Sequence, residues 1–227
     1  MPTNVLEFAR RVEHDSALQE GLSLLFEAIE AKTPSRRLSY AEFLEWADED
    51  TLAEWENGEI TMSSPASLIH QDIAGFLALI LRVYVNAHEL GTIISAPFQV
   101  KLPETGREPD LLFVRQEHAD RLRPTYLDGA ADVVVEIISP ESLTRDRGAK
   151  FIEYEEAGIP EYWLIDPIRR WTECYQLGDE RRYVTEFAGS SGLYRSAQIR
   201  DFWLRIEWLW QTPTLRLTDV MRELELM

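Results

Sequence analysis

The side chains best suited to chemistry in this sequence are two acids and a lysine, Asp110, Glu136 and Lys150. Acidic side chains on neighbouring strands can converge on one hard divalent cation, since Mg²⁺ prefers oxygen ligands and keeps several waters for a substrate phosphate. A lysine close to such a cation could neutralise one acid or activate a water. Together the three residues would supply the parts that metal-assisted hydrolysis of a phosphodiester needs.

The segment 132–167 must position two of these residues. It holds two short apolar runs, VVVEII and YWLI, on either side of a polar amphipathic stretch, which is the pattern of strand, crossover helix and strand. Strands that are apolar on both faces are covered on both sides, so we expect Glu136 where little water reaches it. A carboxylate there is costly unless a metal, a cation or several donors hold it. In the helix that follows, Asp146, Lys150 and Tyr154 share one face.

Other helices are indicated by apolar spacing and by capping residues. Two short helices are expected within 4–31, and a third begins at the capping box of Ser39 and Glu42. A long helix is expected at 67–89; it carries His70 and stops at Gly91. A further helix is capped by Ser139-Pro140-Glu141, and a closing helix lies near 217–224.

Other strands are indicated by apolar runs bounded by turn residues. They are expected at 51–62 as a hairpin that turns at Asn57-Gly58 and carries Glu54, at 92–102, at 107–114 with Pro109-Asp110 at its opening, and at 171–187 as a hairpin through Gly178-Asp179.

The charge and composition limit the partners. The formal net charge of −17 argues against a general nucleic-acid coat, because affinity for phosphate backbones comes largely from Lys and Arg. Nucleic-acid contact would need divalent cations or a local basic patch such as Arg121, Arg123, Arg145 and Arg147.

The single cysteine, Cys174, allows no disulfide within the chain and favours a reducing compartment. The longest apolar stretch, from Ala74, is interrupted by Arg82 and is too short to cross a bilayer, and the first residues lack the pattern of a signal peptide. We therefore expect a cytoplasmic protein without a membrane partner.

Each candidate residue also has a plain structural interpretation. Glu136 could form a structural ion pair or stay wet at a sheet edge, Asp110 could start a strand or cap a turn, and Lys150 could be solvated. Asp146 could interact with the dipole of its own helix. Tyr154 could serve in packing alone, and His70 could be a histidine at the edge of the core. A glycosidase that uses Asp110 and Glu136 as its carboxylate pair is a further alternative, although no aromatic sugar platform is evident near them.

Several of these segments recur together in a known pattern. WENGEITMSSP with His70, EPDLLFV, VVVEIISPES and RDRGAKFIEYEEAGIPEYWLIDP resemble the Uma-type family of restriction endonucleases, a branch of the PD-(D/E)xK nuclease superfamily. The resemblance covers roughly Ser39 to Leu177. It implies an α/β fold, with a three-layer α/β/α restriction-endonuclease-like core around a mixed sheet, Mg²⁺-dependent phosphodiester cleavage and often a homodimer.

The family's site carries over by motif. Asp110 matches the aspartate of the PD element, Glu136 the acid of the second strand and Lys150 the lysine of the following helix; Glu54 and His70 match residues that border the site. The superfamily's usual lysine lies two residues after the acid, where this chain has Ile138, so Lys150 would reach the same point from the helix.

We expect a helical extension over 1–37, an endonuclease-like core over 38–190 and a strand and helix tail over 191–227. The leading hypothesis is an endonuclease in which Asp110 and Glu136 bind Mg²⁺ or Mn²⁺, Lys150 orients or deprotonates the attacking water, and Glu54, His70 and Asp146 support the site. Its substrate would be nucleic acid, expected to be DNA. The alternative is a catalytically inactive descendant that acts as a binding or dimerisation module.

Overall fold

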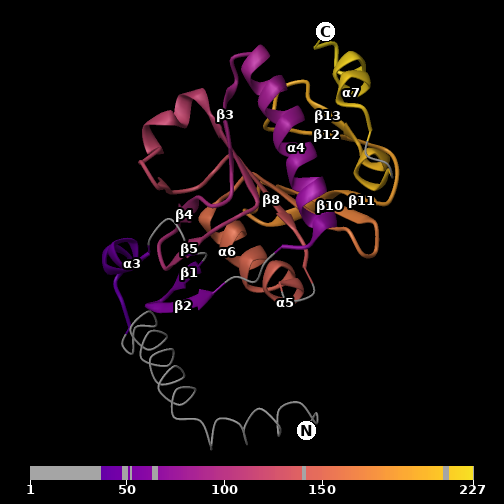
Figure 1. Cartoon of the computed structure of the whole chain (residues 1–227). Coiled ribbons are helices and arrows are strands. Elements are labelled where there is room, and N and C mark those ends of the chain that lie inside the picture. Colours follow the sequence, from indigo (N-terminus) through magenta and orange to yellow (C-terminus); the bar gives the residue numbers. More distant parts are fainter. Residues whose placement is uncertain are drawn as a thin grey trace, which may run out of the picture.

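A computed structural model describes residues 37–47, 51, 53–62, 66–139, 142–211 and 215–226. The two helices expected within 4–31 lie outside these residues. The largest unit is a six-stranded mixed sheet with the strand order β11-β10-β9-β8-β6-β3 (Figure 1). Its strands are β3 (Gly91–Ser95), β6 (Leu111–Arg115), β8 (Val133–Ile137), β9 (Glu161–Asp166), β10 (Trp171–Leu177) and β11 (Tyr183–Gly189).

The strand, helix and strand unit predicted for 132–167 is confirmed. Strands β8 and β9 are parallel neighbours, which a crossover connection must join. Two helices, α5 (Leu143–Arg147) and α6 (Ala149–Ala157), stand where one was expected, and they meet at Gly148. The predicted cap was wrong, because α5 begins after Ser142; the two serines Ser139 and Ser142 instead bond each other's backbone N–H groups, and Pro140 and Glu141 are outside the described residues.

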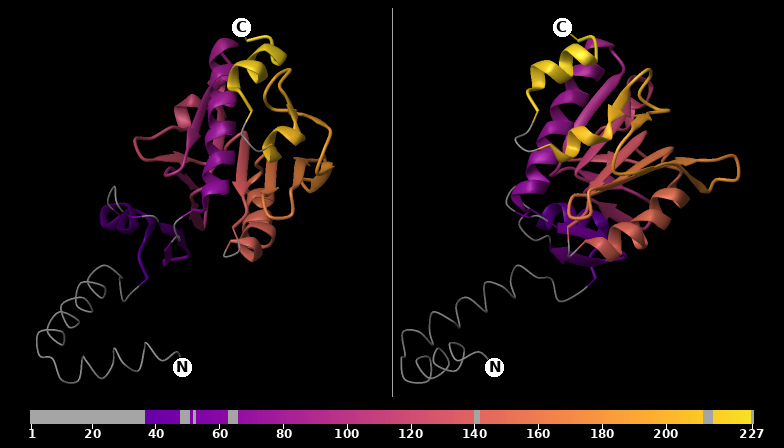
Figure 2. Two further views of the ribbon diagram at one scale, coloured as in Figure 1. Left: turned by 45° about the vertical axis from the view of Figure 1, so that its right-hand side comes forward. Right: turned by 90° about the vertical axis from the view of Figure 1, so that its right-hand side faces the viewer.

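Helices cover both faces of the large sheet (Figure 2). Helix α4 (Leu68–Ala87) packs against one face together with Val133 and Val135, whereas Val134 packs on the opposite side with residues of α6. Successive side chains of a strand point to opposite faces, so Glu136 faces α6. The predicted three-layer α/β/α core with a mixed sheet is therefore confirmed.

The C-terminal segment packs on the same side as α4. Its elements are β12 (Leu193–Arg195), β13 (Trp203–Arg205), the 3₁₀ helix η2 (Ile206–Trp210) and α7 (Leu217–Glu223). Their aromatic and aliphatic side chains, Phe202 and Trp208 among them, share one apolar core with α4. Helix α4 is longer than the apolar stretch expected, and by length and composition alone it could cross a membrane; in this structure its apolar face lies in the core.

A smaller five-stranded sheet, in the order β2-β1-β5-β4-β7, lies beside the large one. Its strands are β1 (Ala53–Glu56), β2 (Glu59–Met62), β4 (Gln99–Lys101), β5 (Thr105–Arg107) and β7 (Tyr126–Asp128). The hairpin at Asn57-Gly58 and the capping box of Ser39 and Glu42, which heads α3 (Tyr40–Trp46), are confirmed. The 3₁₀ helix η1 (Gln116–Arg121) leads into β7.

The strands expected at 92–102 and 107–114 were wrong in extent, because each splits between the two sheets. The first divides into β3 and β4 at the Ala96-Pro97 bond, and the second into β5 and β6 just before Leu111. Proline has no N–H to continue a ladder, which explains the first break. The chain therefore crosses between the sheets at both of these breaks, and Asp110 lies at the second one.

Gly91 begins β3 and does not end α4, which contradicts the expected stop. Its φ is 149°, and a Cβ there would lie 2.1 Å from the carbonyl oxygen of Val114 in the neighbouring strand. Glycine is thus required by the close approach of the backbones.

Candidate active site

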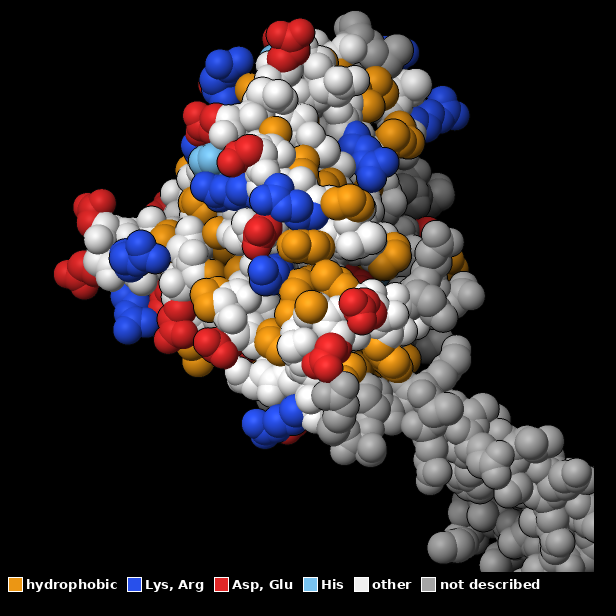
Figure 3. Space-filling model, turned by 90° about the vertical axis from the view of Figure 1, so that its left-hand side faces the viewer, with side chains coloured by type: hydrophobic (Ala, Val, Ile, Leu, Met, Phe, Trp, Pro, Cys, Tyr) orange, Lys and Arg blue, Asp and Glu red, His pale blue; other side chains and the backbone are white. Residues whose placement is uncertain are grey.

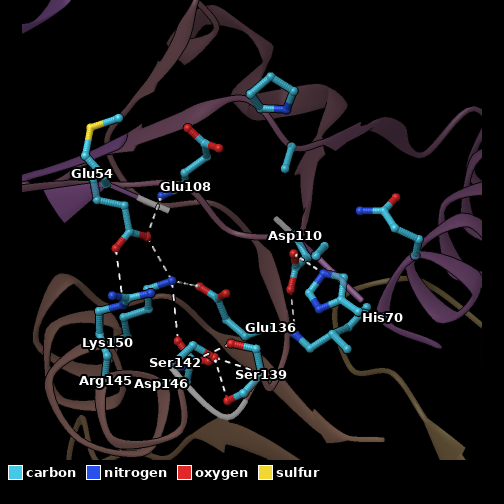
Figure 4. A pocket seen from close by; sticks show the side chains of 16 residues that line it. Glu54, His70, Glu108, Asp110, Glu136, Ser139, Ser142, Arg145, Asp146 and Lys150 are labelled. Atoms are coloured by element: carbon cyan, nitrogen blue, oxygen red, sulfur yellow. Dashed lines mark hydrogen bonds and ion pairs between the residues drawn. The ribbon is translucent and has the colours of Figure 1, made fainter. Parts of the chain in front are cut away.

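A pocket with a volume of about 340 Å³ opens where the two sheets, α4 and the α5–α6 pair meet (Figure 4). Its acidic lining comes from five side chains and its permanently basic lining from two. The acids are Glu54, Glu108, Asp110, Glu136 and Asp146, and the bases are Arg145 and Lys150. Acids therefore exceed these bases by three in a mostly buried space.

Lys150 lies at the centre of the acidic side chains (Figure 4). Its Nζ is 2.9 Å from Glu136 Oε1, 2.9 Å from Glu54 Oε1 and 3.5 Å from Asp146 Oδ1, and only 3% of its side chain is exposed. The first turn of α6 supplies the lysine, β8 and β1 supply the two glutamates, and α5 supplies the aspartate. One ammonium thus connects four elements from both sheets and the crossover.

The electrostatics follow from burial and from this contact. Burial raises the pKa of Glu136 far more than Lys150 lowers it, and nearby Asp146 and Asp110 raise it further. Burial would also raise the pKa of Glu54, but Lys150, its largest opposing influence, lowers the net value. For Lys150 burial favours the neutral amine, yet the surrounding carboxylates raise its pKa, so the lysine is held as an ammonium.

Both donors to Glu136 use the same oxygen. Lys150 Nζ and Tyr154 Oη, one helical turn apart on α6, donate to Oε1 at 2.9 and 2.7 Å. Within the part of the chain that the structure describes, no donor reaches Oε2. The carboxylate is therefore fixed by one oxygen while the other keeps its capacity to bind a further group.

Asp110 is placed by the pairing of β6 with β8. Leu111 pairs with Val135 in an antiparallel ladder, so Asp110 lies next to Glu136 and accepts the backbone N–H of Ile137 at 2.6 Å through Oδ2. Its Oδ1 lies 2.9 Å from Nε2 of His70, on the first turn of α4.

His70 fixes Asp110 as part of a half-buried pair. Burial favours the neutral imidazole, but the hydrogen bond and charge of Asp110 outweigh it and raise the pKa of His70. Its Nδ1 is buried and has no hydrogen-bond partner among the described residues. The imidazole therefore holds one side of the Asp110 carboxylate, and the backbone of Ile137 holds the other.

Arg107, at the end of β5, is fully buried and joins the small sheet to the lysine helix. Its guanidinium bonds both oxygens of Glu153 at 2.7 and 2.6 Å, bonds Glu56 at 2.8 Å and reaches Glu54 at 3.5 Å. Glu153 lies one turn after Lys150 on α6. The arginine thus fixes the distance between Glu54 on β1 and the helix that carries the lysine.

Comparison with known proteins adds a family to this geometry. The model of the family Uma2, described as “Putative restriction endonuclease”, matches residues 40–207. The chain belongs to this family. The match extends beyond Leu177, where the resemblance had been expected to end, and also takes in β11, β12 and β13.

A likeness to solved structures agrees with this family. Five chains of known structure match, among them the crystal structure of a “putative nuclease belonging to DUF820” from Anabaena variabilis. It is 17% identical, has a TM-score of 0.66 and aligns over 76% of this chain and 97% of its own. At this identity the likeness shows the fold. No curated protein matches the sequence.

The structure brings all six residues predicted for the Uma2 site into the one pocket. They are Glu54, His70, Asp110, Glu136, Asp146 and Lys150. The expected contact between Lys150 and Glu136 is present, whereas their catalytic and metal-binding roles stay predictions. Asp146 lies in the pocket beside the lysine and is not only a helix dipole partner.

Sequence reasoning missed three contributors. Tyr154 was assigned to packing, although its position one turn after Lys150 was the available signal. Glu108 lines the pocket, and burial raises its pKa to about 7. No local pattern marks Arg107, because its partners lie on strands and helices far away in the sequence.

The four arginines predicted as one basic patch lie on two separate segments. Arg121 donates to a backbone carbonyl, and Arg123 pairs with an acid of β7. Arg145 and Arg147 belong to α5, the first lining the pocket and the second paired with an acid of β10. Only the α5 pair is close to the candidate site.

The donor set fits a hard divalent cation. Among the described residues no three His, Cys, Asp or Glu side chains are arranged to hold a metal ion, but Mg²⁺ commonly uses one or two carboxylates together with waters and substrate phosphate. Asp110 and Glu136 supply two carboxylates in one pocket, and Oε2 of Glu136 accepts from no donor in the described part of the chain. The excess of acids over bases in the lining also favours a cation.

Proposed function

We propose that this chain is a metal-dependent endonuclease that hydrolyses phosphodiester bonds in nucleic acid. Its membership in the Uma2 family supports the reaction class. The observation that carries the proposal is the convergence of Asp110, Glu136 and Lys150 in one pocket, with Lys150 on one oxygen of Glu136 and the other oxygen free of donors from the described residues.

Asp110 and Glu136 would hold Mg²⁺ or Mn²⁺, which supplies a Lewis acid for the phosphate and lowers the pKa of a bound water. His70 and the backbone of Ile137 hold Asp110 in position, and Tyr154 holds Glu136.

Lys150 has only donors to offer while it is an ammonium. It was expected to orient or deprotonate the attacking water; three carboxylate contacts favour orientation and stabilisation of the charge that develops on the phosphate. Glu54 and Asp146 keep the lysine in place. Abstraction of a proton is therefore not assigned to Lys150.

The proposal takes DNA as the substrate and a homodimer as the working form, both on the strength of the family resemblance. Light scattering of the purified protein tests the second point. A mass equal to one chain at assay concentration would remove the homodimer from the proposal and leave the reaction untouched.

The direct experiment is cleavage of plasmid, single-stranded DNA and RNA with Mg²⁺, with Mn²⁺ and with chelator. Glu136→Gln keeps the size of the side chain and removes its charge, so we expect a loss of about 10³-fold or more in cleavage rate. Glu223→Gln, on exposed α7, is the matched control and should cleave normally. Cleavage that persists in chelator, or in Glu136→Gln, contradicts the proposal.

One observation favours the inactive alternative. The described surface on the side of α3 mixes acidic, basic and hydrophobic side chains and presents no continuous basic face (Figure 3), and the whole chain has a net charge of −17. Weak attraction to duplex phosphate follows. A binding module with the same pocket would bind cations without cleaving any of the three substrates.

A further inference from the structure

A second recess lies beside α5. It is an open groove with a volume of about 570 Å³, lined by Arg147, Arg169, Trp171 and Glu173. We call it the arginine–tryptophan groove. It is separate from the pocket, and nothing in the proposed reaction uses it.

The groove lies on the same face of the sheet as the pocket. Glu136 pairs with Leu164 in the ladder of β8 and β9, and Leu164 pairs with Glu173 in the ladder of β9 and β10. Paired residues point to the same face, and neighbouring strands are about 4.8 Å apart, so Glu173 lies about 10 Å from Glu136 across the sheet. Helix α5 bridges the two, since Arg145 lines the pocket and Arg147 lines the groove.

The chemistry of the groove is unusual for so acidic a chain. The turn between β9 and β10 exposes Ile168 (70%) and the side chain of Arg169 (62%), and Trp171, the first residue of β10, is 38% exposed. Arg147 and Arg169 each use Nη1 in an ion pair, with Glu173 and a buried acid of β9, which leaves further N–H donors on both guanidinium groups.

Guanidinium groups next to an exposed indole provide what a flexible nucleic-acid strand needs, since arginine forks match phosphate oxygens and a flat ring accepts a stacked base. A base can stack on Trp171 only if it is unpaired. The charge of −17 also disfavours the long row of phosphate contacts that duplex DNA offers.

From this arrangement we infer that the arginine–tryptophan groove binds a single-stranded segment of nucleic acid, with a base against Trp171 and phosphates against Arg147 and Arg169. The inference rests on the proposed function for its purpose, which is to hold the strand beside the bond that is cut. It adds a substrate preference for unpaired strands or for duplex ends and flaps.

The test is fluorescence anisotropy of a short labelled single-stranded DNA of mixed sequence, in chelator so that no cleavage occurs. We expect Trp171→Leu to weaken binding about tenfold, because stacking on one aromatic ring contributes on the order of 1–3 kcal/mol. Trp171→Tyr keeps a stacking ring and should restore most of the affinity. Wild-type protein should bind a duplex of the same sequence more weakly than the single strand.

A charge variant provides an independent test if the tryptophan variants fold poorly. Arg169 lines the groove and 62% of its side chain is exposed, so Arg169→Gln should keep the turn. The salt dependence of single-strand binding should fall in this variant, with the slope reduced by about 0.7, because the protein then neutralises one phosphate fewer. Arg222→Gln is the control, because Arg222 is as exposed on α7 and also pairs with an aspartate three residues away; it should leave the slope unchanged.

The outcomes separate this inference from the proposed function. Single-strand binding that depends on Trp171 in a protein that never cleaves supports the groove and contradicts the nuclease. Cleavage with unchanged binding in both groove variants contradicts the groove alone. Equal affinity for duplex and single strand, or no single-strand binding by wild type at low salt, also overturns the inference.

Discussion

Two buried glutamates on neighbouring strands of the large sheet, Glu136 on β8 and Glu161 on β9, have opposite surroundings. Glu161 is fully buried, and both of its oxygens accept hydrogen bonds from uncharged donors. These donors are Trp163 Nε1, Tyr194 Oη, Ser196 Oγ and the backbone N–H groups of Ala197 and Gln198. Glu136 is also buried, but its two donors share one oxygen and acids surround it.

The difference separates a carboxylate whose hydrogen bonding is complete from one that keeps an oxygen without a donor from the described residues. Burial raises the pKa of both, and around Glu161 a complete set of hydrogen bonds opposes that rise. Around Glu136 the lysine opposes it, whereas nearby aspartates add to it. The fold therefore completes the bonding of Glu161, while Glu136 lacks a partner that a cation can supply.

The largest effect on stability is expected at the lysine. Lys150→Met leaves Glu136, Glu54 and Asp146 without their shared cation, so the free energy of unfolding in chelator should fall by about 4 kcal/mol, as measured by urea denaturation. Lys101→Met removes a half-exposed lysine paired with Asp128 and serves as the control. A loss below about 0.5 kcal/mol at Lys150 would show that the acids need no ammonium.

Glu161→Gln should lower the free energy of unfolding by about 3 kcal/mol. The new side-chain NH₂ group would face N–H donors that now bond the carboxylate, and the charged acceptor would be lost. Divalent-ion affinity, measured by calorimetry on the folded variant, should stay at the wild-type value. Glu180→Gln, in the exposed turn of the β10–β11 hairpin, controls for the loss of one charge. If divalent-ion affinity falls in Glu161→Gln, the two glutamates do not differ in their role toward the ion.

Tyr154→Phe should have a smaller effect on stability, about 1 kcal/mol, since it removes one hydrogen bond from Glu136 without a cavity. Divalent-ion affinity should fall because only one of the two donors that fix the carboxylate remains. Tyr183→Phe removes the bond to the Ile159 carbonyl and should cost similar stability at unchanged ion affinity. Equal ion affinities in the two variants would remove Tyr154 from the site.

The part of this site that the sequence predicted is local. Asp146 and Lys150 share a face because they are four residues apart, and an acid within an apolar strand identified Glu136; Tyr154, on the same face, was assigned to packing. The proximity of Asp110 and Glu136 was expected from two acids on neighbouring strands, whereas the place of His70 rested on family resemblance, because its sequence separation hides the contact.

The parts that were missed depend on distant segments. The donors to Glu161 come from residues 194–198, so nothing near IPEYWLI distinguishes this acid from Glu136. The second sheet was missed because each of two apolar segments was taken as one strand, although Pro97 divides the first. Arg107 could not be assigned without the register of β1 and β5, since its partners lie on β1 and on α6, far away in the sequence.

We infer that Glu136 lacks a partner which a divalent cation supplies. Thermal unfolding of wild type and Glu136→Gln, with and without Mg²⁺ or Mn²⁺, tests this inference directly. We expect the ion to raise the Tm of wild type, by the equivalent of about 2.7 kcal/mol at an ion concentration of 100 Kd. Glu136→Gln should be at least as stable as wild type in chelator and should show no rise in Tm with the ion. No rise in wild type, or the same rise in both proteins, would contradict it.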